Sequence, residues 1–147
     1  MPKNIINLND IEQHARSRAV VASGGATERY GAKMWMLGRA MGAVQLGYNV
    51  TSVPPGKRAF PFHNHRVNEE LFLILKGSGE IRIGKDSYPV KQHDLIGCPP
   101  GGEESAHQII NTGESELAYL AVSTKLSPEI ANYPDSGKFA VLAEYPP

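Results

Sequence analysis

Two histidines and a glutamate lie close together in the segment from residue 56 to 79, and their types suit metal binding. His63 and His65 are two residues apart, so in a β-strand both imidazoles face the same side. Four residues separate His65 from Glu70, which is the wrong parity for one continuous strand, so we expect residues 66–69 to form a bulge or turn. Neutral imidazoles and an ionised carboxylate bind divalent cations. The segment therefore predicts half of a metal site.

A second stretch, residues 92–111, offers the remaining ligand. His107 lies on an alternating run that follows the turn-forming residues 99–101. Any one of these histidines alone is as readily explained as an ordinary polar residue of the surface or core. The joint spacing favours a shared site in which His107 is the fourth ligand.

Short strand-like runs surround these residues, and turn signals separate them every eight to twelve residues. This spacing is typical of a sandwich or barrel and not of a fold with helical crossovers. The run at 71–75 is apolar throughout, and we expect it to be buried on both faces. The predicted strands are 45–53, 60–65, 71–75, 80–83, 87–90, 94–98, 106–111 and 116–123.

The segments outside the predicted barrel are expected to be short helical or irregular arms. We divide the single domain into an N-terminal arm at 1–42, a barrel at 43–124 and a C-terminal arm at 125–147. In the first arm, Asp10 and Gln13 resemble a helix cap for one or two turns at 11–16.

The two apolar segments of the arms need cover. Residues 30–43 are expected to pack over the outside of a sheet. In the second arm, Pro128 is typical of a first helical position and predicts one turn through residue 130 or 131. The apolar residues 139–142 predict a last strand, either on the same barrel or on a partner subunit.

The first metal segment resembles the first motif of the cupin superfamily. That motif has a glycine, about five residues, H-x-H, three or four residues, a glutamate, six residues and a glycine. Here Gly56 is followed by six residues and then by His63 and His65, and six residues separate Glu70 from Gly77. Only the first spacer departs, by one residue.

The second segment resembles the second cupin motif, which has a glycine, five residues, P-x-G, two residues, a histidine, three residues and an asparagine. Pro99, Gly101 and Asn111 match this pattern. His93 stands where the glycine usually is, and His107 comes five residues after the P-x-G turn instead of two. The resemblance covers about residues 43–123 and implies an all-β, double-stranded β-helix (jelly-roll) cupin barrel.

The resemblance also implies one divalent ion of zinc, manganese, iron, nickel or cobalt, with positions left open for a small-molecule ligand. Cupins similar to this chain are often described as candidate sugar phosphate isomerases, so one hypothesis is an isomerase or epimerase acting on a small carbohydrate or sugar phosphate. His93 and Glu104 are then candidate catalytic acid or base groups. Lys57 and Arg58 are candidates for contact with a phosphate, although two solvated loop charges are the simpler explanation.

Two other functions fit the same ligands. An iron-dependent dioxygenase uses a comparable set, and a non-catalytic cupin binds a small ligand without turnover. Thiol dioxygenation has less support, because such cupins usually lack the glutamate that Glu70 supplies. The sequence favours isomerisation through the resemblance alone.

Composition limits the partners. The chain has 147 residues with 15 basic and 15 acidic side chains, so its net charge is zero. A neutral chain is not expected to attract nucleic acid or an anionic membrane. The first ten residues lack a secretory pattern, and no apolar run is long enough to span a bilayer, so we expect a cytoplasmic protein. The single cysteine, Cys98, agrees with a reducing compartment. A homodimer is expected, because sheet edges and the segments 34–37 and 139–142 need cover.

Overall fold

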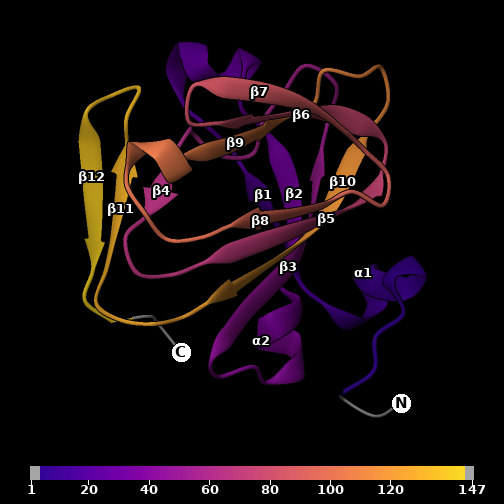
Figure 1. The fold of residues 1–147 in the computed structure, drawn as a ribbon. Coiled ribbons are helices and arrows are strands. Elements are labelled where there is room, and N and C mark those ends of the chain that lie inside the picture. The colour runs from indigo at the N-terminus through magenta and orange to yellow at the C-terminus, as the bar shows by residue number, and fades with distance from the viewer. Residues whose placement is uncertain (1–3, 145–147) are drawn as a thin grey trace.

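Twelve β-strands dominate residues 4–144, the part of the chain that the computed structural model describes, and they form two facing layers (Figure 1). The predicted jelly-roll barrel is confirmed. The strands are β1 Ser17–Val20, β2 Ala32–Trp35, β3 Leu46–Val53, β4 Asn64–His65, β5 Glu70–Lys76, β6 Ser78–Ile83, β7 Asp86–Lys91, β8 Leu95–Cys98, β9 His107–Ile110, β10 Leu117–Thr124, β11 Glu129–Tyr133 and β12 Lys138–Leu142. The helices are α1 Ile11–His14 and α2 Leu37–Met41, with short 3-10 helices at Leu8–Asp10, Gly24–Glu28 and Glu103–Ser105.

One layer is a six-stranded sheet in the order β1-β2-β3-β10-β5-β8. The other consists of two three-stranded sheets, β7-β6-β9 and β12-β11-β4. An antiparallel bridge between His63 and His107 joins these two sheets, with backbone N···O distances of 3.2 and 2.8 Å. Two of the predicted metal ligands therefore lie where the two sheets of the second layer meet.

The side chains of β5 alternate between the two faces of its sheet. Phe72 and Ile74 are buried between the layers, whereas Leu71 on the outer face is 39% exposed. The expectation of a strand buried on both faces is therefore wrong. The outer face is apolar for another reason: Leu75 packs against the outer cluster that contains Ile11 of α1.

The N-terminal segment extends the six-stranded sheet as well as covering it. β1 pairs with β2, and β2 pairs with β3. Met34 and Leu37 are 6% and 4% exposed, so the apolar segment 34–37 is covered by its own chain. Asp10 makes no side-chain cap to α1, contrary to expectation, whereas the side chain of Asn7 accepts a hydrogen bond from the N–H of Asn9 in the preceding 3-10 helix.

The C-terminal segment is a β-hairpin. The helical turn predicted after Pro128 is wrong, because residues from Glu129 onward form β11, which pairs with β4 on one side and β12 on the other. Pairing with distant strands outweighs the local helix-start pattern. The predicted last strand is confirmed as β12 on the same barrel, with Phe139 68% exposed. None of the helices within residues 4–144 has the length and apolar character needed to cross a membrane.

Candidate metal centre

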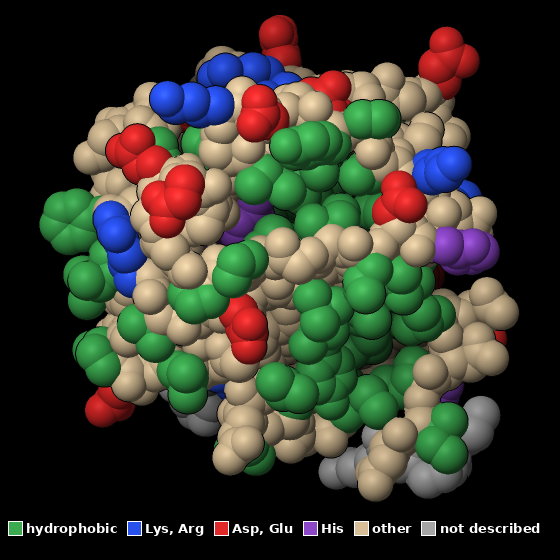
Figure 2. All heavy atoms as spheres, in the orientation of Figure 1, with side chains coloured by type: hydrophobic (Ala, Val, Ile, Leu, Met, Phe, Trp, Pro, Cys, Tyr) green, Lys and Arg blue, Asp and Glu red, His purple; other side chains and the backbone are tan. Residues whose placement is uncertain are grey.

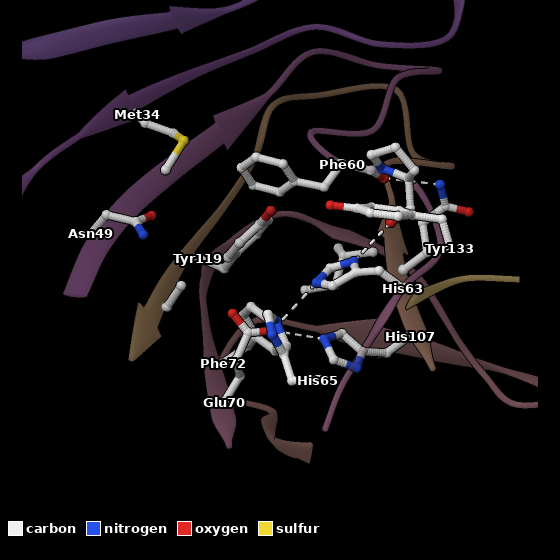
Figure 3. A pocket seen from close by; sticks show the side chains of 14 residues that line it. Met34, Asn49, Phe60, His63, His65, Glu70, Phe72, His107, Tyr119 and Tyr133 are labelled. Atoms are coloured by element: carbon white, nitrogen blue, oxygen red, sulfur yellow. Dashed lines mark hydrogen bonds and ion pairs between the residues drawn. The ribbon is translucent and has the colours of Figure 1, made fainter. Parts of the chain in front are cut away.

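A cavity of about 290 Å³ lies between the two layers, and the predicted metal ligands form part of its wall (Figure 3). Apolar side chains form much of the rest, which limits how water reaches the polar groups. The lining residues are Met34, Asn49, Phe60, Pro61, His63, His65, Glu70, Phe72, His107, Gln108, Ile109, Tyr119, Ala121 and Tyr133.

Three imidazoles meet one carboxylate oxygen in this cavity. The Nε2 atoms of His107, His65 and His63 lie 2.8, 3.2 and 3.6 Å from Oε2 of Glu70. One ligand atom each of His63, Glu70 and His107 lies within 4.8 Å of the others, close enough for one ion. The structure thus brings together all four residues that the sequence predicts as metal ligands.

Backbone geometry explains this convergence. His63 and His65 face the cavity while Asn64 between them points away, and its buried side-chain amide donates to the carbonyl of Gly101 at 2.8 Å. Residues 66–69 leave the strand as predicted, because β4 ends at His65 and β5 begins at Glu70. The turn changes the parity, so Glu70 enters the next strand with its carboxylate toward the cavity.

The second ring nitrogens fix how two imidazoles are oriented. Nδ1 of His63 lies 2.8 Å from the carbonyl oxygen of Pro61, and Nδ1 of His107 lies 3.1 Å from that of Ser105. A carbonyl can only accept, so each Nδ1 carries the proton and directs Nε2 toward Glu70. Both ring nitrogens of His65 are buried without a hydrogen bond. Three imidazoles and one carboxylate fit a divalent ion, which would bind Nε2 of His65, the buried nitrogen that faces Glu70.

In the metal-free protein, Glu70 and His107 form an ion pair within this cluster. Burial alone would raise the pKa of Glu70, but contacts with His107, His63 and His65 outweigh it and hold the pKa well below its ordinary value. Burial would lower the pKa of His107, but the neighbouring Cys98 and Glu70 raise it to about 10. At neutral pH the Glu70 carboxylate is therefore ionised and the His107 ring is cationic.

The two predicted acid or base groups lie outside the cavity. His93 is exposed in the turn between β7 and β8, where its φ is 75°. Glu104 is exposed, and its carboxylate accepts a hydrogen bond from the N–H of Gly102 at 2.8 Å, which lowers its pKa. Neither residue is among those that line the cavity. We do not include them in the proposed site, because the chain directions at these two turns carry them away from the ligands.

The predicted phosphate contacts also lie elsewhere. Nζ of Lys57 donates to the carbonyl of Thr27 at 3.1 Å, and the guanidinium of Arg58 lies over the ring of Tyr30. Neither lines the cavity. Sequence analysis missed several groups that do line it, such as Tyr119 and Gln108. Gln108 directly follows His107, so strand alternation would place it on the opposite face and gives no signal for it. Burial raises the pKa of Tyr119, with a further contribution from Glu70, so its phenol stays protonated.

Comparison with known protein families shows to which family the chain belongs. The model of the cupin domain matches residues 49–123, the segment that holds all four converging side chains. The chain belongs to the cupin family. This cupin is 33% identical over 70 residues to an oxalate-binding protein of Thermotoga maritima, covering 48% of this chain and 54% of the relative, and 30% identical over 90 residues to auxin-binding protein 1 of Arabidopsis thaliana, covering 55% of this chain and 43% of the relative. It spans about half the length of the curated relatives it matches.

Solved structures extend the likeness beyond the family match. A proposed sugar phosphate isomerase of Acidithiobacillus ferrooxidans superposes with a TM-score of 0.78 at 23% identity, covering 96% of this chain and 92% of that one. A sugar phosphate isomerase of the cupin superfamily from Silicibacter pomeroyi gives a TM-score of 0.77 at 24% identity, with 90% of each chain covered. At these identities the likeness establishes the fold, including the strands outside the matched domain.

Proposed function

We propose that this cupin binds one divalent metal ion through His63, His65, Glu70 and His107 and acts on a small carbohydrate or sugar phosphate as an isomerase or epimerase. The observation that carries the proposal is the convergence of three Nε2 atoms, at 2.8 to 3.6 Å, on one oxygen of Glu70 beside a cavity. A bound divalent ion would supply a Lewis acid that polarises a carbonyl or hydroxyl oxygen of the ligand. The names of the two similar structures support the substrate class.

The protein's own groups would bind and orient the substrate. Phe60 and Phe72 form apolar walls that exclude water, and Tyr119 offers a protonated phenol as a hydrogen-bond donor. Asn49 and Gln108 add amide groups, although Nε2 of Gln108 already donates to the carbonyl of Phe60 at 3.0 Å. A cavity of about 290 Å³ is at the lower end of the usual range for ligand pockets, which favours a small molecule.

The charge of the wall restricts where a phosphate could bind. Within the described residues 4–144, none of those that line the cavity is lysine or arginine. A neighbouring groove, which shares Phe60, Pro61 and Tyr133 with the cavity, includes Arg29 and Lys138 in its wall. A sugar phosphate would therefore place its oxygen-rich end in the cavity and its phosphate toward this groove.

Proton exchange tests the proposed activity. Metal would be measured in protein purified without nickel affinity, and aldoses, ketoses and their phosphates would then be incubated with it in deuterium oxide. We expect exchange of the substrate proton beside the carbonyl that needs the metal and persists under argon. Turnover that stops under argon and is supported by iron alone would instead assign the alternative, iron-dependent oxygenation.

A second candidate is a binding protein without turnover. Apart from the four proposed ligands, the titratable residues among 4–144 that line the cavity are Tyr119 and Tyr133, and this part of the chain offers no further carboxylate or imidazole there as a base. This observation favours a non-catalytic cupin. Binding of a carbohydrate or small oxo-acid in calorimetry, with no metal-dependent exchange for the whole substrate panel, would establish it.

Metal binding is expected to release protons. His107 has a pKa of about 10 in the metal-free protein, whereas a ligand imidazole must be neutral. Each ion bound at pH 8 should therefore displace about one proton, and affinity should rise by up to about tenfold per pH unit between pH 7 and 10. Calorimetry with Zn²⁺ in two buffers of different ionisation enthalpy measures the number released.

The same pKa predicts how stability depends on pH without metal. Because the folded-state pKa of His107 is raised, its stabilising contribution is complete below its ordinary pKa of about 6.5 and is lost as pH rises through about 10. Urea denaturation in a chelator should show this loss, and the Zn²⁺-loaded protein should not. Zn²⁺ binding with no proton release at pH 8 would contradict the protonated state of His107.

A homodimer is also proposed. Figure 2 shows hydrophobic side chains gathered on the outer face of the six-stranded sheet, where Leu71 and Leu95 are 39% and 71% exposed. On β12, Phe139 and Val141 are 68% and 60% exposed. Burying such surface in a two-fold pair would stabilise both copies. Light scattering is expected to give twice the chain mass, and a single-chain mass over a hundredfold concentration range would refute the dimer.

A further inference from the structure

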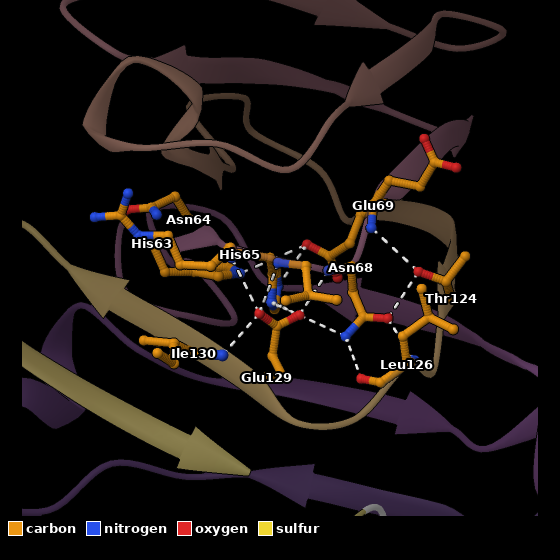
Figure 4. Close-up of polar contacts among 12 residues, drawn as sticks. His63, Asn64, His65, Asn68, Glu69, Thr124, Leu126, Glu129 and Ile130 are labelled. Atoms are coloured by element: carbon orange, nitrogen blue, oxygen red, sulfur yellow. Dashed lines mark hydrogen bonds and ion pairs between the residues drawn. The ribbon is translucent and has the colours of Figure 1, made fainter. Parts of the chain in front are cut away.

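Among the three histidines of the centre, His65 is the one whose Nδ1 faces a carboxylate. Nδ1 of His63 and of His107 each point at a backbone carbonyl, whereas Nδ1 of His65 lies 3.6 Å from Oε2 of Glu129. This nitrogen is buried and makes no hydrogen bond in the metal-free protein. Figure 4 shows the Glu129 carboxylate beside His65, and Glu129 is not among the residues that line the cavity.

Glu129 is fully buried and receives a dense set of donors (Figure 4). Its Oε1 accepts from the backbone N–H groups of Arg66, Val67 and Ile130 at 3.0, 3.0 and 2.8 Å. Its Oε2 accepts from the backbone N–H and the side-chain amide of Asn68. These contacts fix the conformation of the turn at residues 66–69, which connects His65 to Glu70.

The charge of Glu129 is held by hydrogen bonds and faces a histidine. Its Oε2 lies 3.6 Å from Nδ1 of His65, and Arg66, whose backbone N–H donates to Glu129, directs its guanidinium to Asn132. Burial would raise the pKa of Glu129, but the hydrogen bonds from Asn68, Val67 and Ile130 outweigh it, so the group is ionised. A buried anion needs compensation, and a divalent ion close by would compensate the charges of both Glu129 and Glu70.

We propose that Glu129 is a positioning residue of the metal centre, which accepts the Nδ1 proton of His65 and so presents Nε2 of that ring to the ion. The inference rests on the proposed metal site. A carboxylate behind a ligand imidazole fixes the tautomer and the ring orientation and makes the ring a stronger donor. Glu129 lies outside the segment 49–123 that matches the cupin domain, so the C-terminal hairpin becomes part of the site.

The test compares Glu129→Gln with the wild type, using Zn²⁺ as the probe. Glutamine keeps the size but loses the charge, and it places an amide where Asn68 donates. We expect the affinity for Zn²⁺, measured by competition with a chelator, to fall about 10- to 100-fold. In the Zn²⁺-loaded wild type, nitrogen-15 NMR of histidine should show Nδ1 of His65 protonated and in slow exchange with solvent, and in the variant this proton should exchange rapidly.

A matched control separates positioning from anchoring of the turn. Thr124→Val removes the hydroxyl that donates to Oδ1 of Asn68 at 2.8 Å and accepts from the N–H of Glu69, so it loosens the same turn without touching Glu129 or His65. This variant should lose stability, keep its affinity for Zn²⁺ within about threefold and retain the slow His65 proton.

The possible results distinguish a positioning role of Glu129 from anchoring of the turn, and they separate this inference from the proposed metal site. Equal losses of affinity in the glutamine and valine variants would reduce Glu129 to an anchor of the turn and overturn the inference. If the glutamine variant does not fold, the wild-type spectrum decides alone: Zn²⁺ bound with Nδ1 of His65 unprotonated, or freely exchanging, overturns it. A wild type that binds no Zn²⁺ overturns the proposed metal site and the inference together.

Discussion

Replacing His107 with alanine is expected to abolish stoichiometric metal binding. His107 is 3% exposed and makes the shortest contact with Glu70, at 2.8 Å, so its loss removes one of the four proposed ligands and leaves the carboxylate with less compensation. Removing an outer partner of a ligand already costs 10- to 100-fold in affinity, and loss of the ligand itself should cost at least about a hundredfold. Metal analysis after dialysis and a Zn²⁺ titration measure the effect.

His14→Ala is the matched control for that variant. His14 ends α1 and is not among the residues that line the cavity, so its removal should leave one equivalent of metal bound. Because His107 also supports the bridge between the two sheets of the second layer, circular dichroism must show that its variant is folded. A folded His107→Ala protein that retains a full equivalent at wild-type affinity would refute the ligand assignment.

The glycine that closes the first motif should be sensitive to substitution for a steric reason. Gly77 has a φ of 80°, and a Cβ there would overlap the carbonyl oxygen of Glu116. The left-handed conformation costs other residues about 1–2 kcal/mol, and displacing packed backbone adds about 1–3 kcal/mol. Gly77→Ala is therefore expected to lower the free energy of unfolding by about 2–5 kcal/mol, as measured by urea denaturation in a chelator.

Gly56→Ala separates the two contributions. Gly56 opens the same motif with a φ of 76°, but a Cβ there would have no atom within 4 Å. Its substitution should cost only the conformational part, about 1–2 kcal/mol. Equal losses in the two variants would show that the contact with Glu116 does not restrict residue 77.

The residues of the metal centre could be predicted from sequence because local rules govern them. The two-residue period of a strand places His63 and His65 on one side, and the odd separation of Glu70 requires the turn that the structure shows at 66–69. His107 is distant from the other three residues in the sequence, and no local rule connects it to them. It could be assigned because its spacing to Asn111 resembled a family motif, and the His63–His107 bridge explains the proximity.

The arrangement of the strands was also predictable from local patterns. The predictions that failed depend on contacts between residues far apart in the sequence. Alternation and turn residues indicate a two-layer barrel, but whether an apolar strand such as 71–75 is buried on one face or two depends on which elements cover the outside. Here α1 and α2 cover part of that face and leave Leu71 exposed. Likewise, His93 and Glu104 fall in the second motif region, yet their turns carry both away from the cavity.

By itself the sequence determined the barrel architecture, the four converging side chains and the turn between them, because periodicity, turn chemistry and ligand type act over a few residues. Only the tertiary structure reveals the contacts of Glu129 on which its proposed role rests. Its local context, after a proline, favours a helix start, whereas its carboxylate accepts from residues 61 to 63 positions earlier in the chain. Donors that distant meet one carboxylate only after β11 has paired with β4, and no pattern along the chain records that pairing.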